Sequence, residues 1–252
     1  MGISVTAAAG VAVVTIDFPP VNGIPVQGWF DLADAVRSTG RDLSVHAVVL
    51  RAENRGFCAG VDIKEVDGDP GAMVAVNRAC HAAFGAVYDC AVPVIAAVHG
   101  FCLGGGVGIA GNADVVVAAE DATFGLPEVD RGVLGAATHL ARLVPQHLLR
   151  AMYYTAETVG AQQLHQYGSV YRVVPRAELD AAATELAGRI AAKDTRVVRR
   201  AKEAINGIDP VDVHRSYRFE QGFTFELALT KEGGRHEACG MPGEGVGPPR
   251  RG

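Results

Sequence analysis

The chain has 252 residues, of which 49% are hydrophobic and 20% are charged, and these proportions are ordinary for a globular protein. Its formal net charge is −5 at pH 7, so we expect neither nucleic acid nor an anionic membrane as its main partner. The sequence has no long apolar span and no secretory pattern at its start, which predicts a cytoplasmic protein.

The first half of the chain alternates between strand and helix patterns. β-branched or apolar runs predict strands over Val11–Phe18, Ala47–Arg51, Val94–Val98 and Ala113–Ala119. Helical spacing of apolar residues predicts helices over Val26–Ser38 and Pro70–Ala91. Strands that alternate with helices indicate an α/β fold with a parallel sheet covered by helices.

After Phe124 the pattern becomes mainly helical. Helices are predicted over Gly135–Val144, Pro145–Thr155, Ala161–Tyr167, Ala177–Ala192 and Thr195–Asn206, with a short strand over Val170–Val173. The last predicted helix, Pro210–Thr230, carries Tyr217, Phe219, Phe223 and Phe225. These aromatic residues either dock against another subunit or pack on their own domain. Residues 233–252 contain seven glycines and three prolines, which predicts a disordered tail.

Two glycine turns each follow a predicted strand. Gly104, Gly105 and Gly106 open a helix, and the sequence FCAGVDI over residues 57–63 forms an earlier turn. The first N–H groups of a helix have no intrahelical partner and lie at its positive end. Together the two turns could supply two N–H donors to an oxygen that becomes negative during a reaction.

Three other kinds of site are disfavoured. Residues 106–111 match the G-x-G-x-x-G dinucleotide pattern, but the acidic residue that should follow about 20 positions later is misplaced. Cys58 and Cys102 flank the glycine turns, yet no histidine spacing pairs with either thiol, so the five cysteines are interpreted as reduced core residues. We expect no metal site, because C-x-x-C and H-x-x-x-H patterns are absent.

Three sequence blocks carry a specific resemblance. FCAGVDIKE at 57–65, AAVHGFCLGGG at 96–106 and ATFGLPE at 122–128 occur in order, and the likeness extends over about residues 3–230. The chain thereby resembles the crotonase (enoyl-CoA hydratase/isomerase) superfamily. The resemblance implies a spiral of ββα units with an acyl-CoA site in residues 1–200 and a helical region, 201–232, that packs homotrimers or hexamers. It implies an acyl-CoA thioester as ligand and no further cofactor.

The resemblance also assigns roles to individual residues. It implies an oxyanion hole made by the N–H groups of Val61 and Gly105, with Glu128 as the catalytic carboxylate. Ala59, Ile63 and Lys64 are implied to line the acyl-CoA channel, and the candidates for its phosphates are Arg51, Arg55 and Lys64. Hydratases of the family have a second glutamate on the helix after the three glycines. This chain has Gly108 there, and we expect the vacant space to accommodate a bulky acyl group.

Three further polar residues have both a functional and a structural interpretation. Asp62 follows the oxyanion residue and either reacts or braces its turn. Arg131 either meets a substrate carboxylate or pairs with Glu128, and His139 replaces a polar residue common in the family. Either Arg131 or His139 could receive a carboxylate formed in the reaction.

A narrower resemblance covers PPVN at 19–22, residues 28–36, 126–140 and 220–227. These stretches are similar to the branch of the superfamily that opens a ring during steroid and cholesterol catabolism. The branch implies a hydrolytic retro-Claisen cleavage of a bicyclic dione CoA thioester, in which Glu128 deprotonates water. The alternatives are an enoyl-CoA hydratase or double-bond isomerase, and an acyl-CoA binder without catalysis.

Overall fold

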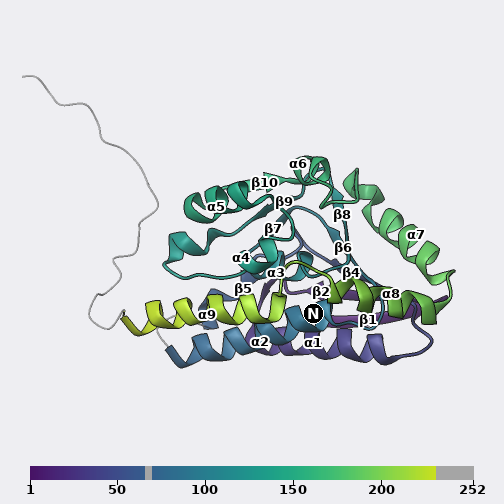
Figure 1. Cartoon of the computed structure of the whole chain (residues 1–252), viewed down its shortest axis with the longest axis horizontal. Helices are drawn as coiled ribbons and strands as arrows, with labels where there is room; N and C mark the ends of the chain where they lie inside the picture. The colour runs from purple at the N-terminus through teal and green to yellow at the C-terminus, as the bar shows by residue number, and fades with distance from the viewer. Residues whose placement is uncertain (66–69, 231–252) are drawn as a thin grey trace, which may run out of the picture.

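The computed structural model describes residues 1–65 and 70–230 (Figure 1). Its main sheet has six strands in the order β1-β2-β4-β6-β8-β11. These strands are β1 (Gly2–Ala8), β2 (Val11–Asp17), β4 (Ala47–Ala52), β6 (Val94–Val98), β8 (Val115–Ala119) and β11 (Arg172–Val174). β1 pairs antiparallel with β2, and every other pairing in this sheet is parallel. The predicted parallel sheet is therefore confirmed, with one antiparallel edge strand added.

Helices cover both faces of this sheet, which explains why β6 and β8 are apolar throughout. All five residues of β6 are buried. On one face α1 (Val26–Arg41) and α2 (Pro70–Tyr88) pack side by side, and on the other α7 (Leu179–Ala191) lies across β4, β6 and β8 (Figure 1). Leu50 and Val98 belong to the core on the first face, and Val49 and Ala97 to the core on the second.

Two small sheets lie beside the main one and were not predicted. One has the order β10-β9-β7, from Thr158–Gly160, Thr123–Gly125 and Phe101–Leu103, and the other pairs β3 (Gly23–Ile24) with β5 (Gly60–Val61). Strands of two or three residues are too short to show a period in the sequence. They matter here because β5 lies within the first glycine turn and β7 leads directly into the second.

The remaining helices are α3 (Gly105–Ala110), α4 (Ala137–Leu140), α5 (Gln146–Thr155), α6 (Ala161–Gln166), α8 (Thr195–Gly207) and α9 (Val213–Thr230), with short 3-10 turns at Ile63–Glu65, Pro127–Arg131 and Arg176–Glu178. The predicted helix over Gly135–Val144 is wrong in extent, because α4 is a single turn. It begins after Ala136, whose φ of 63° is outside the helical range.

The proposed domain boundary at residue 200 falls inside α8. This helix is fixed to the core by Lys202, which is buried. Its Nζ donates to Asp114 Oδ2 at 2.7 Å and to the carbonyl of Val92 at 3.3 Å. A buried ammonium needs such partners, and it ties the C-terminal helices to the end of the central strands.

The aromatic residues of α9 divide between the two interpretations. Tyr217 is 5% exposed and packs on the core of its own domain, whereas Phe219 and Phe223 are 70% and 42% exposed and contact each other edge-on.

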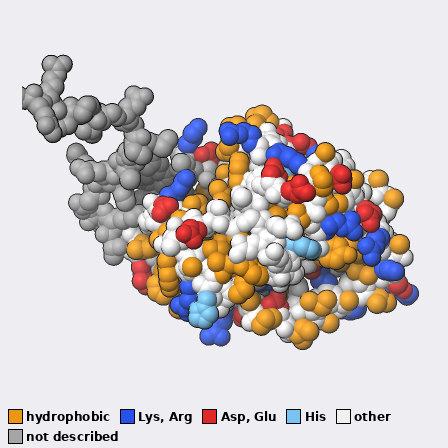
Figure 2. Space-filling model, turned by 90° about the horizontal axis from the view of Figure 1, so that it is seen from above, with side chains coloured by type: hydrophobic (Ala, Val, Ile, Leu, Met, Phe, Trp, Pro, Cys, Tyr) orange, Lys and Arg blue, Asp and Glu red, His pale blue; other side chains and the backbone are white. Residues whose placement is uncertain are grey.

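The tail 233–252 lies outside the described residues. Charges of both signs are mixed on the face shown in Figure 2. Within the described part of the chain, no helix has the length and apolarity required to span a membrane.

Candidate active site

A cavity of about 220 Å³ opens where the glycine turns, α2, α9 and the loop before α4 meet. Its lining is largely apolar. The lining residues are Ala59, Gly60, Val61, Met73, Val76, Asn77, Cys80, Phe84, Leu103, Gly104, Gly105, Pro127, Glu128, Arg131, Val133, Leu134, Gly135, Ala136 and Tyr217. The polar side chains among them are few, as is usual for a pocket that binds a small molecule.

The two glycine turns abut at one wall of the cavity. A Cβ atom built on Gly60 would lie 3.4 Å from the nitrogen of Gly105. Asp62 donates its N–H to the carbonyl of Ile24 in β3, and successive N–H groups of an extended strand point in opposite directions. The N–H of Val61 therefore points away from β3. Gly105 is the first residue of α3, so its N–H has no partner within that helix.

Gly104 holds the backbone that presents the N–H of Gly105. Its φ of 54° and ψ of −115° are accessible to glycine but not to residues with a Cβ. A Cβ built there would lie 2.4 Å from Oε1 of Glu128. The glutamate carboxyl thus lies directly over the backbone that leads into α3.

Glu128 belongs to the 3-10 turn Pro127–Arg131, and its carboxyl group enters the cavity. Oε2 is buried and has no hydrogen-bond partner among the described residues. The pKa of Glu128 is raised to about 8, mainly by burial; the nearby Glu220 carboxylate contributes to this rise and Arg131 opposes it. A carboxyl group with these properties can take up a proton near neutral pH.

A hydrogen-bond network behind Glu128 was not predicted. Glu220 on α9 accepts the N–H groups of Ala137 and Thr138 at 2.9 and 3.2 Å, and it accepts the hydroxyl of Tyr153 at 2.8 Å. The Tyr153 hydroxyl in turn accepts the N–H of Gly135 at 3.2 Å. The network holds the loop before α4 against α9. Its hydrogen-bonded partners are 18 to 83 positions apart in the chain, so no local pattern could reveal it.

Two further contacts attach α9 to opposite walls of the cavity. Nε2 of Gln221 donates to the carbonyl of Asn77 on α2 at 2.8 Å. The hydroxyl of Thr224 donates to the carbonyl of Leu134 at 2.8 Å. α9 therefore holds both α2 and the loop before α4.

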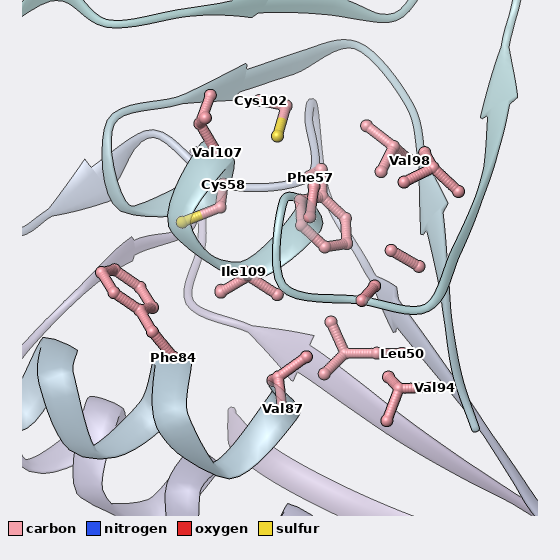
Figure 3. Packing of buried hydrophobic residues seen from close by; sticks show 14 of the residues in the cluster. Leu50, Phe57, Cys58, Phe84, Val87, Val94, Val98, Cys102, Val107 and Ile109 are labelled. Atoms are coloured by element: carbon pink, nitrogen blue, oxygen red, sulfur yellow. The ribbon is translucent and has the colours of Figure 1, made fainter. Parts of the chain in front are cut away.

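The expectation that Gly108 leaves room for a ligand is wrong, because the ring of Phe84 fills that space. A Cβ atom on Gly108 would lie 2.3 to 2.6 Å from three carbons of the ring. Figure 3 shows Phe84 leaving α2 toward α3, which carries Val107 and Ile109. Gly108 itself does not line the cavity, whereas Phe84 does. The missing side chain is thus compensated by a residue 24 positions earlier.

Replacing Gly108 by Ala is expected to destabilise the protein by about 1–3 kcal/mol, because the methyl group overlaps the Phe84 ring in a packed core. Chemical denaturation measures this change. Gly188→Ala in α7 is the matched control, since a Cβ there meets nothing within 4 Å and a helical glycine-to-alanine change is stabilising. Equal responses of the two variants would show that the ring yields without cost.

The structure does not bring His139 to the cavity. The side chain is 1% exposed and lies behind the rings of Phe84 and Tyr217, at centroid distances of 4.9 and 4.8 Å. Its Nδ1 is 3.2 Å from Oδ1 of Asn112. Burial lowers the pKa of His139 to about 3, so the ring is neutral and packs as part of the core.

Asp62 stabilises its own turn, which is the structural one of the two roles considered for it. Its Oδ1 accepts the N–H of Lys64 at 3.1 Å, and its carbonyl accepts the N–H of Glu65. Ala59 and Arg131 line the cavity, whereas Asp62 and Lys64 do not. Lys64 lies in the 3-10 turn Ile63–Glu65 and is exposed, and the side chain of Ile63 is outside the described part of the structure.

The arginines proposed for the coenzyme phosphates lie outside the cavity lining. Arg51 forms ion pairs with Glu53 and with Asp180 of α7. Arg55 is exposed. An arginine already held by two carboxylates is less available to a phosphate than a free one, so Arg51 is a weaker candidate than the sequence indicated.

The thiols behave as the sequence predicts in the part of the chain that the structure describes. Cys58, Cys80, Cys90 and Cys102 are buried and free. Burial raises the pKa of Cys58 to about 12, so it is a protonated thiol and not a nucleophile. Across residues 1–65 and 70–230, no group of three or more His, Cys, Asp or Glu side chains is placed to hold a metal ion.

Comparisons with known proteins agree with this architecture. The family model described as enoyl-CoA hydratase/isomerase matches residues 6–232. The chain is 65% identical to a (7aS)-7a-methyl-1,5-dioxo-2,3,5,6,7,7a-hexahydro-1H-indene-carboxyl-CoA hydrolase of Rhodococcus jostii, with 94% of this chain and 93% of the relative covered. The protein of the same description from Mycobacterium tuberculosis is 61% identical, with 92% and 95% covered.

Solved structures show the same fold. An enoyl-CoA hydratase/isomerase from Xanthobacter autotrophicus superimposes with a TM-score of 0.83 at 26% identity, covering 90% of this chain and 87% of that one. An enoyl-CoA hydratase from Mycobacterium avium gives a TM-score of 0.81 at 27% identity, with 90% and 93% covered.

Proposed function

The chain belongs to the enoyl-CoA hydratase/isomerase (crotonase) family, and from this we propose that it is a hydrolase that opens a ring of a bicyclic dione CoA thioester in steroid degradation. The identities of 65% and 61% to two hydrolases named for such a substrate support this assignment. The single observation that carries the chemistry is the carboxyl group of Glu128. It lies in a largely apolar cavity beside the glycine turns, and its Oε2 has no hydrogen-bond partner among the described residues.

The proposed reaction begins with a water molecule that gives a proton to Glu128. The hydroxide oxygen bonds to the carbonyl carbon of the five-membered ring, and the bond from that carbon to the ring-junction carbon breaks. The released electron pair delocalises through the ring double bond into the thioester carbonyl. The N–H groups of Val61 and Gly105 donate to that oxygen as it becomes negative. The proton held by Glu128 then passes to carbon. The products are an intact thioester and a new carboxylic acid, which loses its proton to solvent and becomes a carboxylate.

Other lining residues receive roles in this scheme. Arg131 lines the cavity and receives the new carboxylate. Ala59 also lines the cavity, and beyond it Ile63 and Lys64 border the coenzyme channel. Asp62 holds the turn that presents Val61. The protein needs no cofactor beyond the coenzyme A of its substrate and works in the cytoplasm. It assembles as a homotrimer or hexamer, with residues 201–232 in the contacts, and the exposed Phe219 and Phe223 support this.

The direct test is mass spectrometry of the products formed from the bicyclic dione thioester in H₂¹⁸O. One ¹⁸O atom in a new carboxylate is expected, with the thioester retained. Label in a carboxylic acid released together with free coenzyme A would instead indicate thioester hydrolysis. The absence of any product would exclude the ring-opening function. The alternative, hydration or isomerisation of a linear acyl-CoA, predicts turnover of crotonyl-CoA in a spectrophotometric assay.

The pH dependence of kcat/KM provides a further prediction. Only the ionised Glu128 can accept a proton from water, and its pKa is raised to about 8. We expect kcat/KM to rise about tenfold per pH unit below this value and to level above it. Stopped-flow or steady-state assays between pH 5.5 and 9.5 measure the profile. A plateau that already extends down to pH 6 would contradict the assignment of Glu128 as the base.

A further inference from the structure

Asn77 presents at the cavity a buried amide nitrogen that has no hydrogen-bond partner in the described part of the structure. Met73, Asn77, Cys80 and Phe84 follow one another at spacings of four, three and four, so they share one face of α2, and all four line the cavity. Asn77 is 7% exposed. Its Nδ2 is buried without a hydrogen-bond partner among the described residues.

The packing of α2 does not account for an amide at this position. The contact that joins α2 to α9 uses the main-chain carbonyl of Asn77, which accepts Nε2 of Gln221, and any residue could supply that carbonyl. The neighbouring lining residues Val76 and Cys80 are apolar. Burying an N–H group without a partner costs free energy, so an apolar residue of similar size would serve packing better.

The chemistry of the cavity indicates what the amide meets. An amide nitrogen carries two N–H donors and needs an acceptor such as a carbonyl oxygen. In the proposed reaction the thioester oxygen is already held by Val61 and Gly105, and the water and new carboxylate are served by Glu128 and Arg131. The substrate in the names of the two relatives is a dione, and its ring ketones add acceptors that a simple acyl-CoA lacks.

We propose that Asn77 is a specificity-determining residue whose amide donates to a ring ketone oxygen of the substrate. The inference rests on the proposed function. It explains why α2 carries a polar side chain in an otherwise hydrophobic wall. A site that offers a buried donor also rejects a ligand without the matching acceptor, because the donor is then left unpaired. Linear enoyl-CoA thioesters are such ligands.

The test measures binding, so that it does not depend on turnover. In the Glu128→Gln background, isothermal titration gives Kd for the bicyclic dione thioester and for the same bicyclic thioester without ring ketones. The dione is expected to bind about tenfold more tightly or better. Adding Asn77→Leu removes the donor at similar volume. It should weaken dione binding by about that factor and should not weaken binding of the ketone-free thioester, because the substitution removes a donor that this ligand leaves unpaired.

Met73→Leu is the matched control, because it alters the same wall of α2 without a donor. It should change both Kd values in parallel. If thermal unfolding shows that the Asn77→Leu variant is not folded, Asn77→Ala replaces it. A ratio of the two Kd values that is the same with and without Asn77 overturns the inference. Failure of the wild-type enzyme to open the dione ring, measured separately, would instead remove the proposed function.

Discussion

Replacing Glu128 by Gln is expected to lower kcat for ring opening by roughly 10²- to 10⁴-fold, the range for loss of a positioned general base. Glutamine has nearly the same shape, but its amide cannot take a proton from water. No neighbour in the described structure depends on the unpaired Oε2 of this carboxyl group for its own hydrogen bonds. The fold and the affinity for coenzyme A should therefore persist. Steady-state kinetics with the dione thioester and titration with coenzyme A measure both quantities.

Glu128→Asp is the informative companion variant. It keeps the carboxylate but withdraws it from Gly104, above which the longer side chain lies. We expect activity between those of the wild type and Glu128→Gln, because the base is present but misplaced. Turnover by Glu128→Gln at the wild-type rate would show that another group activates the water.

Replacing Gly104 by Ala is expected to reduce kcat by about 10²- to 10³-fold, the usual effect of losing one donor of an oxyanion hole. The φ of 54° with ψ of −115° is strained for alanine, so the backbone that presents the N–H of Gly105 must shift. The added methyl group would also lie 2.4 Å from Oε1 of Glu128 and displace that carboxyl group. One substitution thus disturbs the donor and the base together.

Gly168→Ala separates backbone strain from catalysis. Gly168 has a φ of 82°, but a Cβ there meets nothing within 4 Å, and it does not line the cavity. Both variants should lose stability in chemical denaturation, whereas only Gly104→Ala should lose kcat. An unchanged kcat in folded Gly104→Ala would argue against an oxyanion hole at the start of α3.

The features that the sequence predicts well are those encoded locally. Val94–Val98 is predicted as a buried strand and is one in the structure. A strand pattern that ends just before Gly104 and Gly105 is likewise visible in neighbouring residues of the sequence. Glu128 could be selected as the candidate carboxylate because it lies in a short, specific motif. In each case the determining residues are neighbours in the chain, so a pattern over a few positions contains the necessary information.

What the sequence could not predict depends on contacts between distant segments. A glycine at 108 indicates missing volume, but only the packed structure shows Phe84 occupying it. In the same way His139 follows Glu128 closely in sequence, yet Phe84 and Tyr217 come between it and the cavity. Asn77 gives no signal in the sequence, because helical spacing alone does not distinguish a wall of the cavity from a wall of the core.

The attachment of α9 through Glu220, Gln221 and Thr224 has a consequence for selectivity. One helix is hydrogen-bonded to both sides of the cavity. The width of the cavity is therefore set when the protein folds and not when the substrate binds. Little ordering of side chains is then left for the moment of binding, which favours affinity for an acyl group that fits. An acyl group of a different width would require α9 to bend. We therefore expect the enzyme to accept few acyl groups other than that of its own substrate.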